Sequence, residues 1–337
     1  MKTRTVLLVF IVLLVIFPAG HVKGAGTKEY KKFRLELYGG IALIDPSDLN
    51  QQAIYDEQYM TSSRADKYSF LYARYDKNHQ YAGDLSGSFK RINMAIPFGI
   101  RLKYNVNRTI ALSLGFQYIS RNLAYDVDSN YGIYWINPDG LFFKQEYTDN
   151  FSFIDYTLSV KGYIPMLGIH FMTRRSSAIS LEAFAAGGFL FAECSHSAGI
   201  LARVVYPDGY WQGYDYFREM KGTGSGPALE AGVRFNVFIK KHFELFLEGS
   251  YSYITVKRIS GSYADEYQQK DANAVSNAES SSWTGDWHMV QGGFYDYWSS
   301  FSDVYPIVSW GSNFTSAGDF NLDLSGIRLK VGIAYIF

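Results

Sequence analysis

Apolar and polar residues alternate along the last eleven residues of the chain. Large apolar side chains take every odd position from Ile327 to Phe337, and the even positions begin with Arg328 and Lys330. A period of two predicts a β-strand with one apolar face. An edge strand of a soluble protein with this pattern would expose an apolar stripe and unpaired backbone groups. A strand of a barrel in lipid avoids both, because its backbone is paired and its apolar face meets acyl chains.

Seven further segments carry the same alternation. They are Phe33–Leu43, Arg91–Tyr104, Thr109–Tyr118, Ile154–Ile164, Ile179–Phe191, Pro227–Ile239 and Phe243–Tyr253. Together with the C-terminal strand they predict an all-β fold, a closed antiparallel transmembrane β-barrel of eight strands. The count becomes ten if Lys67–Tyr75 and a segment near Val304–Trp310 join the barrel.

The predicted connections alternate between short and long. Residues 105–108, 173–177 and 240–242 are short, whereas residues 44–90, 119–153, 192–226 and 254–324 are long. This asymmetry predicts short periplasmic turns and four long extracellular loops. Pro138-Asp139-Gly140 and Pro207-Asp208-Gly209 stand between aromatic runs. Proline presets φ and glycine takes the left-handed position, so we expect tight turns there, with the third to sixth strands continuing beyond the membrane.

The polar face of the predicted strands carries charges of both signs. Because an eight-stranded barrel is only wide enough for side chains to fill it, and buried charges must pair, we expect an ion-pair network that fills the lumen. Small glycines on the same face would give room for long side chains. The predicted network is Arg34, Glu36, Arg101, Lys103, Glu182, Glu230, Arg234, Glu244, Glu248, Arg328 and Lys330, and the alternation also places Asp155 and Lys161 on the inward face.

The N-terminus has the pattern of an export signal. A basic start is followed by an apolar run of twelve residues, Val6–Phe17, and then by small residues. A membrane-spanning helix needs about 20 residues, so the run predicts a cleaved secretory signal peptide. We expect residues 1–24 to be the signal peptide and residues 25–337 to form one outer-membrane barrel domain.

Composition narrows the classes of function. The chain has 32 basic and 32 acidic residues, and removal of Lys2, Arg4 and Lys23 with the signal peptide leaves about −3. This balance argues against nucleic acid as a partner. Cys194 is the single cysteine, so there is no intrachain disulfide framework and no cysteine-based metal site. Aromatic residues make up 18% of the chain, as is typical of barrels with aromatic girdles.

The signal sequence, the alternating strands, the loop asymmetry and the final Leu329-Lys330-Val331-Gly332-Ile333-Ala334-Tyr335-Ile336-Phe337 resemble the small eight-stranded outer-membrane barrel proteins of Gram-negative bacteria. The resemblance implies the cell outer membrane as location, outer-membrane lipid as surroundings, and the barrel assembly machinery as a partner during insertion. It also implies that the apolar positions of the last strand form the assembly signal, namely Leu329, Val331, Ile333, Tyr335 and Phe337. It does not identify a subfamily.

Two motifs suggest chemistry. Glu193-Cys194-Ser195-His196-Ser197 contains residue types of an esterase or lipid deacylase, but neighbours in sequence do not by default form a catalytic triad. Asp126-Val127-Asp128-Ser129-Asn130 alternates oxygen ligands that Ca²⁺ accepts, without the glycine and distal glutamate of a full calcium loop. The histidines show no metal spacing. We therefore expect no catalytic residue, no metal and no cofactor.

The function expected from these observations is non-enzymatic. All six tryptophans and many tyrosines lie in the predicted outer connections, where they either pack against each other or recognise a ligand. We expect a filled, charge-paired lumen and aromatic-rich surface loops that serve structure, adhesion or capture of an unknown extracellular ligand. The alternatives are a narrow channel or transporter for small solutes, a lipid-modifying or proteolytic barrel enzyme, and a soluble exported β-sandwich.

Overall fold

The computed structural model describes residues 33–54, 56–57, 79–86, 89–136, 143–174, 178–205, 208–240, 242–291, 304–308 and 315–337. The predicted signal peptide and the segment Lys67–Tyr75 lie outside the described residues. No helix in this part of the chain is long and apolar enough to cross a membrane.

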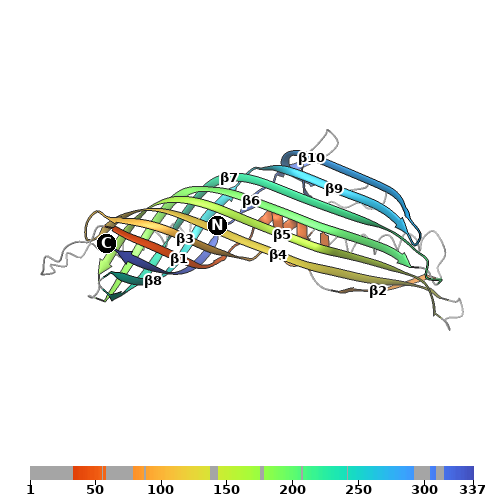
Figure 1. Cartoon of the computed structure of the whole chain (residues 1–337), viewed down its shortest axis with the longest axis horizontal. Helices are drawn as coiled ribbons and strands as arrows, with labels where there is room; N and C mark the ends of the chain where they lie inside the picture. Colours follow the sequence, from red (N-terminus) through yellow and green to blue (C-terminus); the bar gives the residue numbers. More distant parts are fainter. Residues whose placement is uncertain are drawn as a thin grey trace. The chain divides into compact units, whose positions relative to one another are not determined.

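Eight strands pair side by side in a ring (Figure 1). The first strand pairs with the second and also with the last, so the ladder returns to its start, and every pairing is antiparallel. In ring order the strands are β1 (Phe33–Leu43), β3 (Met94–Asn105), β4 (Ile110–Ile136), β5 (Phe143–Arg174), β6 (Ile179–Val205), β7 (Trp211–Lys240), β8 (Phe243–Val256) and β14 (Gly326–Ile336). The ring has the eight strands that the alternation predicts.

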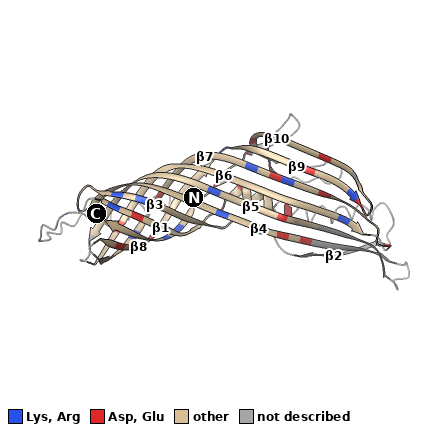
Figure 2. Ribbon diagram, viewed as in Figure 1, with Lys and Arg blue, Asp and Glu red and all other residues tan. Residues whose placement is uncertain are grey.

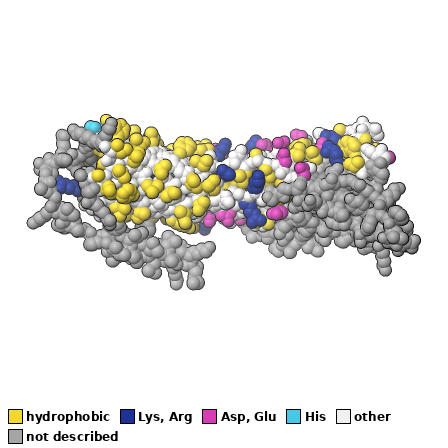
Figure 3. Space-filling view, turned by 90° about the horizontal axis from the view of Figure 1, so that it is seen from below, with side chains coloured by type: hydrophobic (Ala, Val, Ile, Leu, Met, Phe, Trp, Pro, Cys, Tyr) yellow, Lys and Arg dark blue, Asp and Glu magenta, His cyan; other side chains and the backbone are white. Residues whose placement is uncertain are grey.

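The outer and inner faces of the ring follow the period of two. On β14, Ile327, Leu329 and Val331 are exposed, while Arg328 and Lys330 are fully buried. The same alternation of exposed apolar and buried polar positions runs along β1, β3 and β8. Hydrophobic side chains therefore cover the outside of the ring, and charged side chains gather farther along the strands (Figure 3).

Four ring strands are much longer than the others. β4 to β7 have 27 to 32 residues, whereas β1, β3, β8 and β14 have 11 to 14. The predicted continuation of the third to sixth strands is therefore confirmed. Gly209 has a φ of 84°, the left-handed conformation expected for the glycine of the turn between β6 and β7.

The expectation of four long loops needs correction, because much of their length is strand or helix. The fourth connection contains β9 (Ile259–Asp271) and β10 (Val275–Gln291), a hairpin whose first strand pairs with the outer half of β7. β11 (Val304–Val308) and β12 (Thr315–Asp319) pair with β10, so the segment near Val304 does not join the ring. β13 (Leu322–Asp323) pairs with β8.

The first connection also contains regular structure. β2 (His79–Ser86) pairs with the far end of β4. Residues 47–54 and 56–57 are helical, and Leu49 and Ala53 on this segment are buried in the hydrophobic core that the strands enclose. Asn50 holds the segment in place, because its side chain donates to the carbonyl of Ile92 and accepts from the amide of Ile92, both at 2.8 Å. We call this segment the inner helix.

Candidate functional site: the filled interior of the ring

Buried charges occupy the interior of the ring near the chain's C-terminal strand (Figure 2). We call the set the charged plug. All its side chains are at most 8% exposed, and its members are Arg34, Glu36, Arg101, Lys103, Glu182, Glu230, Arg234, Glu244, Glu248, Arg328 and Lys330. These are the residues that the sequence alternation places on the inward face.

Ion pairs join the charged plug into one connected network. Glu36 contacts the cations of Arg234 at 2.6 Å and Lys103 at 3.1 Å, and Glu248 contacts Arg101 and Lys330, each at 3.0 Å. At the ends of the network, Arg34 pairs with Glu244 at 2.8 Å and Lys103 with Glu182 at 2.7 Å. Glu230 pairs with Lys330. Such pairing is what allows these charges to stay buried.

The pairs reach across the interior as well as along its wall. Arg101 on β3 meets Glu248 on β8, and Arg234 on β7 meets Glu36 on β1. In both cases the two strands stand three places apart in a ring of eight. A side chain that bridges strands so far apart fills the space between them, so the charged plug obstructs the interior.

Aromatic rings take the room that two inward glycines leave. A Cβ at Gly99 would lie 2.5 Å from the Tyr38 ring, and one at Gly332 would lie 2.4 Å from the Phe246 ring. Lys330 and Arg101 lie over Tyr38 at 5.2 and 5.1 Å, and Arg234 lies over Phe246 at 3.4 Å. The rings thus add cation–π contacts to the plug. The sequence argument expected long Arg and Lys chains alone to fill this space.

His170 belongs to the charged plug, although sequence reasoning left it out. Its Nδ1 lies 2.5 Å from Glu182 Oε1 and its Nε2 lies 2.8 Å from Ser113 Oγ. The missed signal is the apolar run after Ile164. In β5 the segment with an apolar outer face lies around Leu167 and Ile169, which are exposed, so His170 between two outward positions faces inward.

The same shift corrects two inward assignments. Lys161 and Asp155 were expected inside the barrel, but both are exposed, and Tyr156, Leu158 and Val160 are buried instead. Residues 154–161 lie in the part of β5 where the enclosed space is apolar and the outside polar. Asp155, with a φ of 50°, stands where the pairing register of β5 with β6 shifts. The reversed facing follows from this change of environment along one strand.

An apolar core fills the space that the long strands enclose. It includes Phe153, Tyr156 and Leu158 of β5, Leu190 of β6 and Trp287 of β10. Leu49 and Ala53 of the inner helix belong to the same cluster. The interior is therefore filled by charge pairs at one level and by apolar side chains at the next.

A polar cluster fixes the inner helix to the wall. Asp56 on the helix pairs with Arg218 of β7, accepts from the hydroxyl of Tyr156 at 2.7 Å, and lies 3.7 Å from His196 Nε2. Arg218 Nε donates to His196 Nε2 at 3.2 Å. We call these four residues the helix clamp. Figure 1 shows the short orange coil against β5 and β6.

Burial shifts the titration of the helix clamp. Burial, reinforced by the adjacent Arg218 cation, lowers the pKa of His196 to about 4. Burial and then the Asp56 carboxylate raise the pKa of Tyr156 well above its usual value. His196 is therefore neutral at pH 7, which is the state that can accept the hydrogen bond from Arg218.

The two motifs considered for chemistry do not form reactive sites. Cys194 and His196 face the core, whereas Glu193 is exposed on the other side of β6, because successive residues of a strand point to opposite faces. Asp126 Oδ1 accepts from the amide of Asp155 at 2.8 Å. Among the described residues, no group of three or more His, Cys, Asp or Glu could hold a metal ion.

The tryptophans do not stand in irregular loops where the structure describes them. Trp135, Trp211, Trp283 and Trp287 lie on strands, and Trp298 and Trp310 lie outside the described residues. Trp287 is 1% exposed and meets the Phe320 ring edge-on at 5.1 Å. Trp287 therefore packs inside the extended sheet and is not available for surface recognition.

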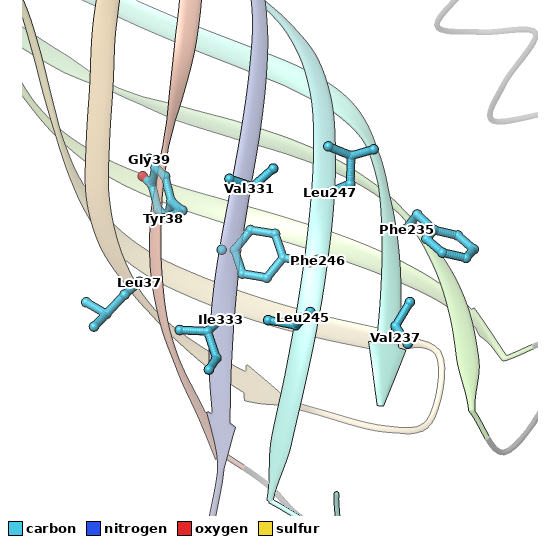
Figure 4. A pocket seen from close by; sticks show the side chains of 11 residues that line it. Leu37, Tyr38, Gly39, Phe235, Val237, Leu245, Phe246, Leu247, Val331 and Ile333 are labelled. Carbon is cyan, nitrogen blue, oxygen red and sulfur yellow. The ribbon is translucent and has the colours of Figure 1, made fainter. Parts of the chain in front are cut away.

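The five residues of the predicted assembly signal form one outward row on β14. Leu329, Val331, Ile333, Tyr335 and Phe337 are 40 to 59% exposed. Beside them runs a shallow apolar groove, to which Leu37, Leu245 and Leu247 of the neighbouring strands also contribute (Figure 4). Its lining is almost wholly apolar, so its chemistry suits a hydrocarbon chain.

No protein-family model and no curated protein matches this chain. Two solved structures are similar at low identity. The outer membrane protein OprG from Pseudomonas aeruginosa shares 11% identity, with 91% of this chain and 97% of OprG covered and a TM-score of 0.30. A major outer membrane protein from Thermus thermophilus shares 10% identity, with 92% of this chain and 100% of that protein covered and a TM-score of 0.29.

Proposed function

We propose that this protein is an outer-membrane β-barrel whose ring spans the lipid bilayer. Exposed aromatic side chains mark the two edges of the apolar band, with Phe243 at one end of β8 and Tyr253 at the other. Ten residues of strand, tilted by about 40°, rise about 25 Å, which is the height of the apolar band of outer-membrane barrels. The short turns would face the periplasm and the long strands of β4 to β7 would project outside the cell.

The proposed role is non-enzymatic, with a sealed interior. The observation that carries it is the set of ion pairs across the ring, such as Arg101–Glu248, above which the apolar core and the inner helix continue the filling. A protein of this kind supports the membrane surface, adheres, or binds a ligand on the outer ends of β4 to β7 and on the β9–β10 hairpin. The seal makes the pore class of barrel the weaker alternative.

Two measurements on one preparation test the proposal. Outer-membrane fractionation, with a heat-dependent gel shift, tests the barrel; recovery from the periplasm without detergent would overturn it. Swelling of proteoliposomes in small sugars tests the seal. We expect no swelling above protein-free liposomes from a sample that shows the gel shift. Swelling that scales with the amount of folded protein would overturn the sealed interior and establish the transporter.

A further inference from the structure

One cation of the charged plug lacks the contacts that hold the others. Arg328 on β14 is fully buried, yet its Nε, Nη1 and Nη2 atoms all lack a hydrogen-bond acceptor. The carboxylate paired with it is that of Glu230, whose Oε2 lies 3.8 Å from Nη1. Glu230 is also engaged elsewhere, because its Oε1 accepts from Lys330 and, at 2.6 Å, from the hydroxyl of Ser250.

The charged plug is also unbalanced by one charge. Its described members are six cations and five carboxylates, which leaves a net charge of +1. The cations are Arg34, Arg101, Lys103, Arg234, Arg328 and Lys330, and the carboxylates are Glu36, Glu182, Glu230, Glu244 and Glu248. A buried charge without compensation costs several kcal/mol, so a group that supplies one negative charge would stabilise the fold. The site of the excess is the guanidinium that has no acceptor.

We propose that a small monovalent anion of the size of chloride binds against the Arg328 guanidinium inside the ring. The side chains opposite Arg328 in the two adjoining ladders are small, Ala42 on β1 and Ser250 on β8. A halide accepts from several N–H groups at once and supplies a single negative charge, which matches the excess. Phosphate or sulfate would overcompensate and needs more room. Water would satisfy the N–H groups but leave the charge. The site depends on burial within the ring and not on the ring's spanning a bilayer.

The first test measures stability against anion type. The folded protein in detergent is exchanged into sodium chloride, bromide or gluconate at equal ionic strength, and the midpoint of the heat-dependent gel shift is followed. Binding to the folded state alone stabilises it in proportion to the logarithm of ligand concentration. We expect a saturable rise of several degrees in chloride and bromide over gluconate. Equal midpoints in all three salts would overturn the proposal.

Variants assign the effect to Arg328. Arg328→Gln should remove the difference between chloride and gluconate, whereas Arg91→Gln, which changes an exposed cation paired with Glu57, should keep it. An unchanged chloride effect in Arg328→Gln would contradict the assignment. Should Arg328→Gln fail to fold, crystals of the unaltered protein grown in bromide decide. We expect an anomalous peak beside the Arg328 guanidinium, and water at that place without bromide would overturn the site.

Discussion

At the scale of single residues, the ion pairs make each carboxylate of the charged plug a point of large energetic effect. Replacement of Glu248 by Gln leaves Arg101 and Lys330 without their shared partner. Breaking a buried pair costs about 3–5 kcal/mol, so we expect a markedly lower midpoint of thermal unfolding. Glu219→Gln is the matched control, because Glu219 and its partner Lys221 are exposed. Equal destabilisation by both variants would contradict the burial of the network.

His196 gives the helix clamp a defined pH dependence. Its folded-state pKa of about 4 is below the ordinary value of 6.5, so the unfolded chain binds more protons between these values. Stability from this group is therefore complete above pH 6.5 and is lost as the pH falls toward 4, on the order of 3 kcal/mol in total. We expect His196→Gln to flatten the thermal midpoint over this window relative to the unaltered protein. Parallel curves would show that His196 does not titrate in this way.

The inward residues of β1, β3, β7, β8 and β14 could be predicted from alternation, because the lipid-like outside and charged inside persist along each of these short segments. Alternation failed where one strand passes between two environments. In β5, Lys161 is outside and His170 inside. The run of apolar residues after Ile164 was visible in the sequence, but only the pairing register shows which part of it faces outward.

At the scale of elements, the inner helix is held by one carboxylate, and the native cysteine reports on it. Cys194 faces the apolar core, where burial raises the pKa of its thiol to about 12, so we expect almost no reaction with maleimide. Asp56→Ala removes the partner of Arg218 and Tyr156, and we expect Cys194 to react at least tenfold faster. Glu57→Ala, on the same helix but half exposed, is the control. Equal rates in the two variants would contradict the clamp.

The last strand carries a separate prediction. Tyr335 meets Phe337 edge-on at 5.0 Å and Phe243 at 5.3 Å, so the outward row of β14 ends in an aromatic cluster. If this row is the assembly signal, removal of Phe337 should lower the amount of assembled, heat-modifiable protein several-fold. Val275→Ser, at an exposed apolar position near the β9–β10 turn, should leave the amount unchanged. Normal assembly without Phe337 would count against the signal.

The strands of the ring were predictable as elements, whereas the content of the long connections was not. Pro-Asp-Gly marked the turn at Gly209 because its chemistry is local. The β9–β10 hairpin is largely polar on both faces in its distal half, so residues such as Gln268 and Ser280 give no alternation to detect. The inner helix is short, and it is stabilised by contacts with distant strands, chiefly Asp56 with Arg218.

At the scale of the whole molecule, two fillings of different chemistry share one interior. The charged plug lies at the level of the outward apolar band, and the apolar core lies at the level where the outside becomes polar. This inversion follows from the surroundings. Inside a lipid-facing ring, the inward face is where charged residues can be kept away from lipid, whereas in the extended part the outward face meets water and the core becomes apolar, as in a soluble protein.

The central claim is that this interior is sealed, and single-channel recording in a planar bilayer tests it most directly. The protein is refolded, shown to be heat-modifiable, and incorporated at known density in symmetric potassium chloride. The account predicts no steady conductance, and it predicts that Arg101→Ala combined with Glu248→Ala, if heat-modifiable, opens resolved steps by removing a cross-ring pair. Steady steps from the unaltered protein would contradict the sealed interior.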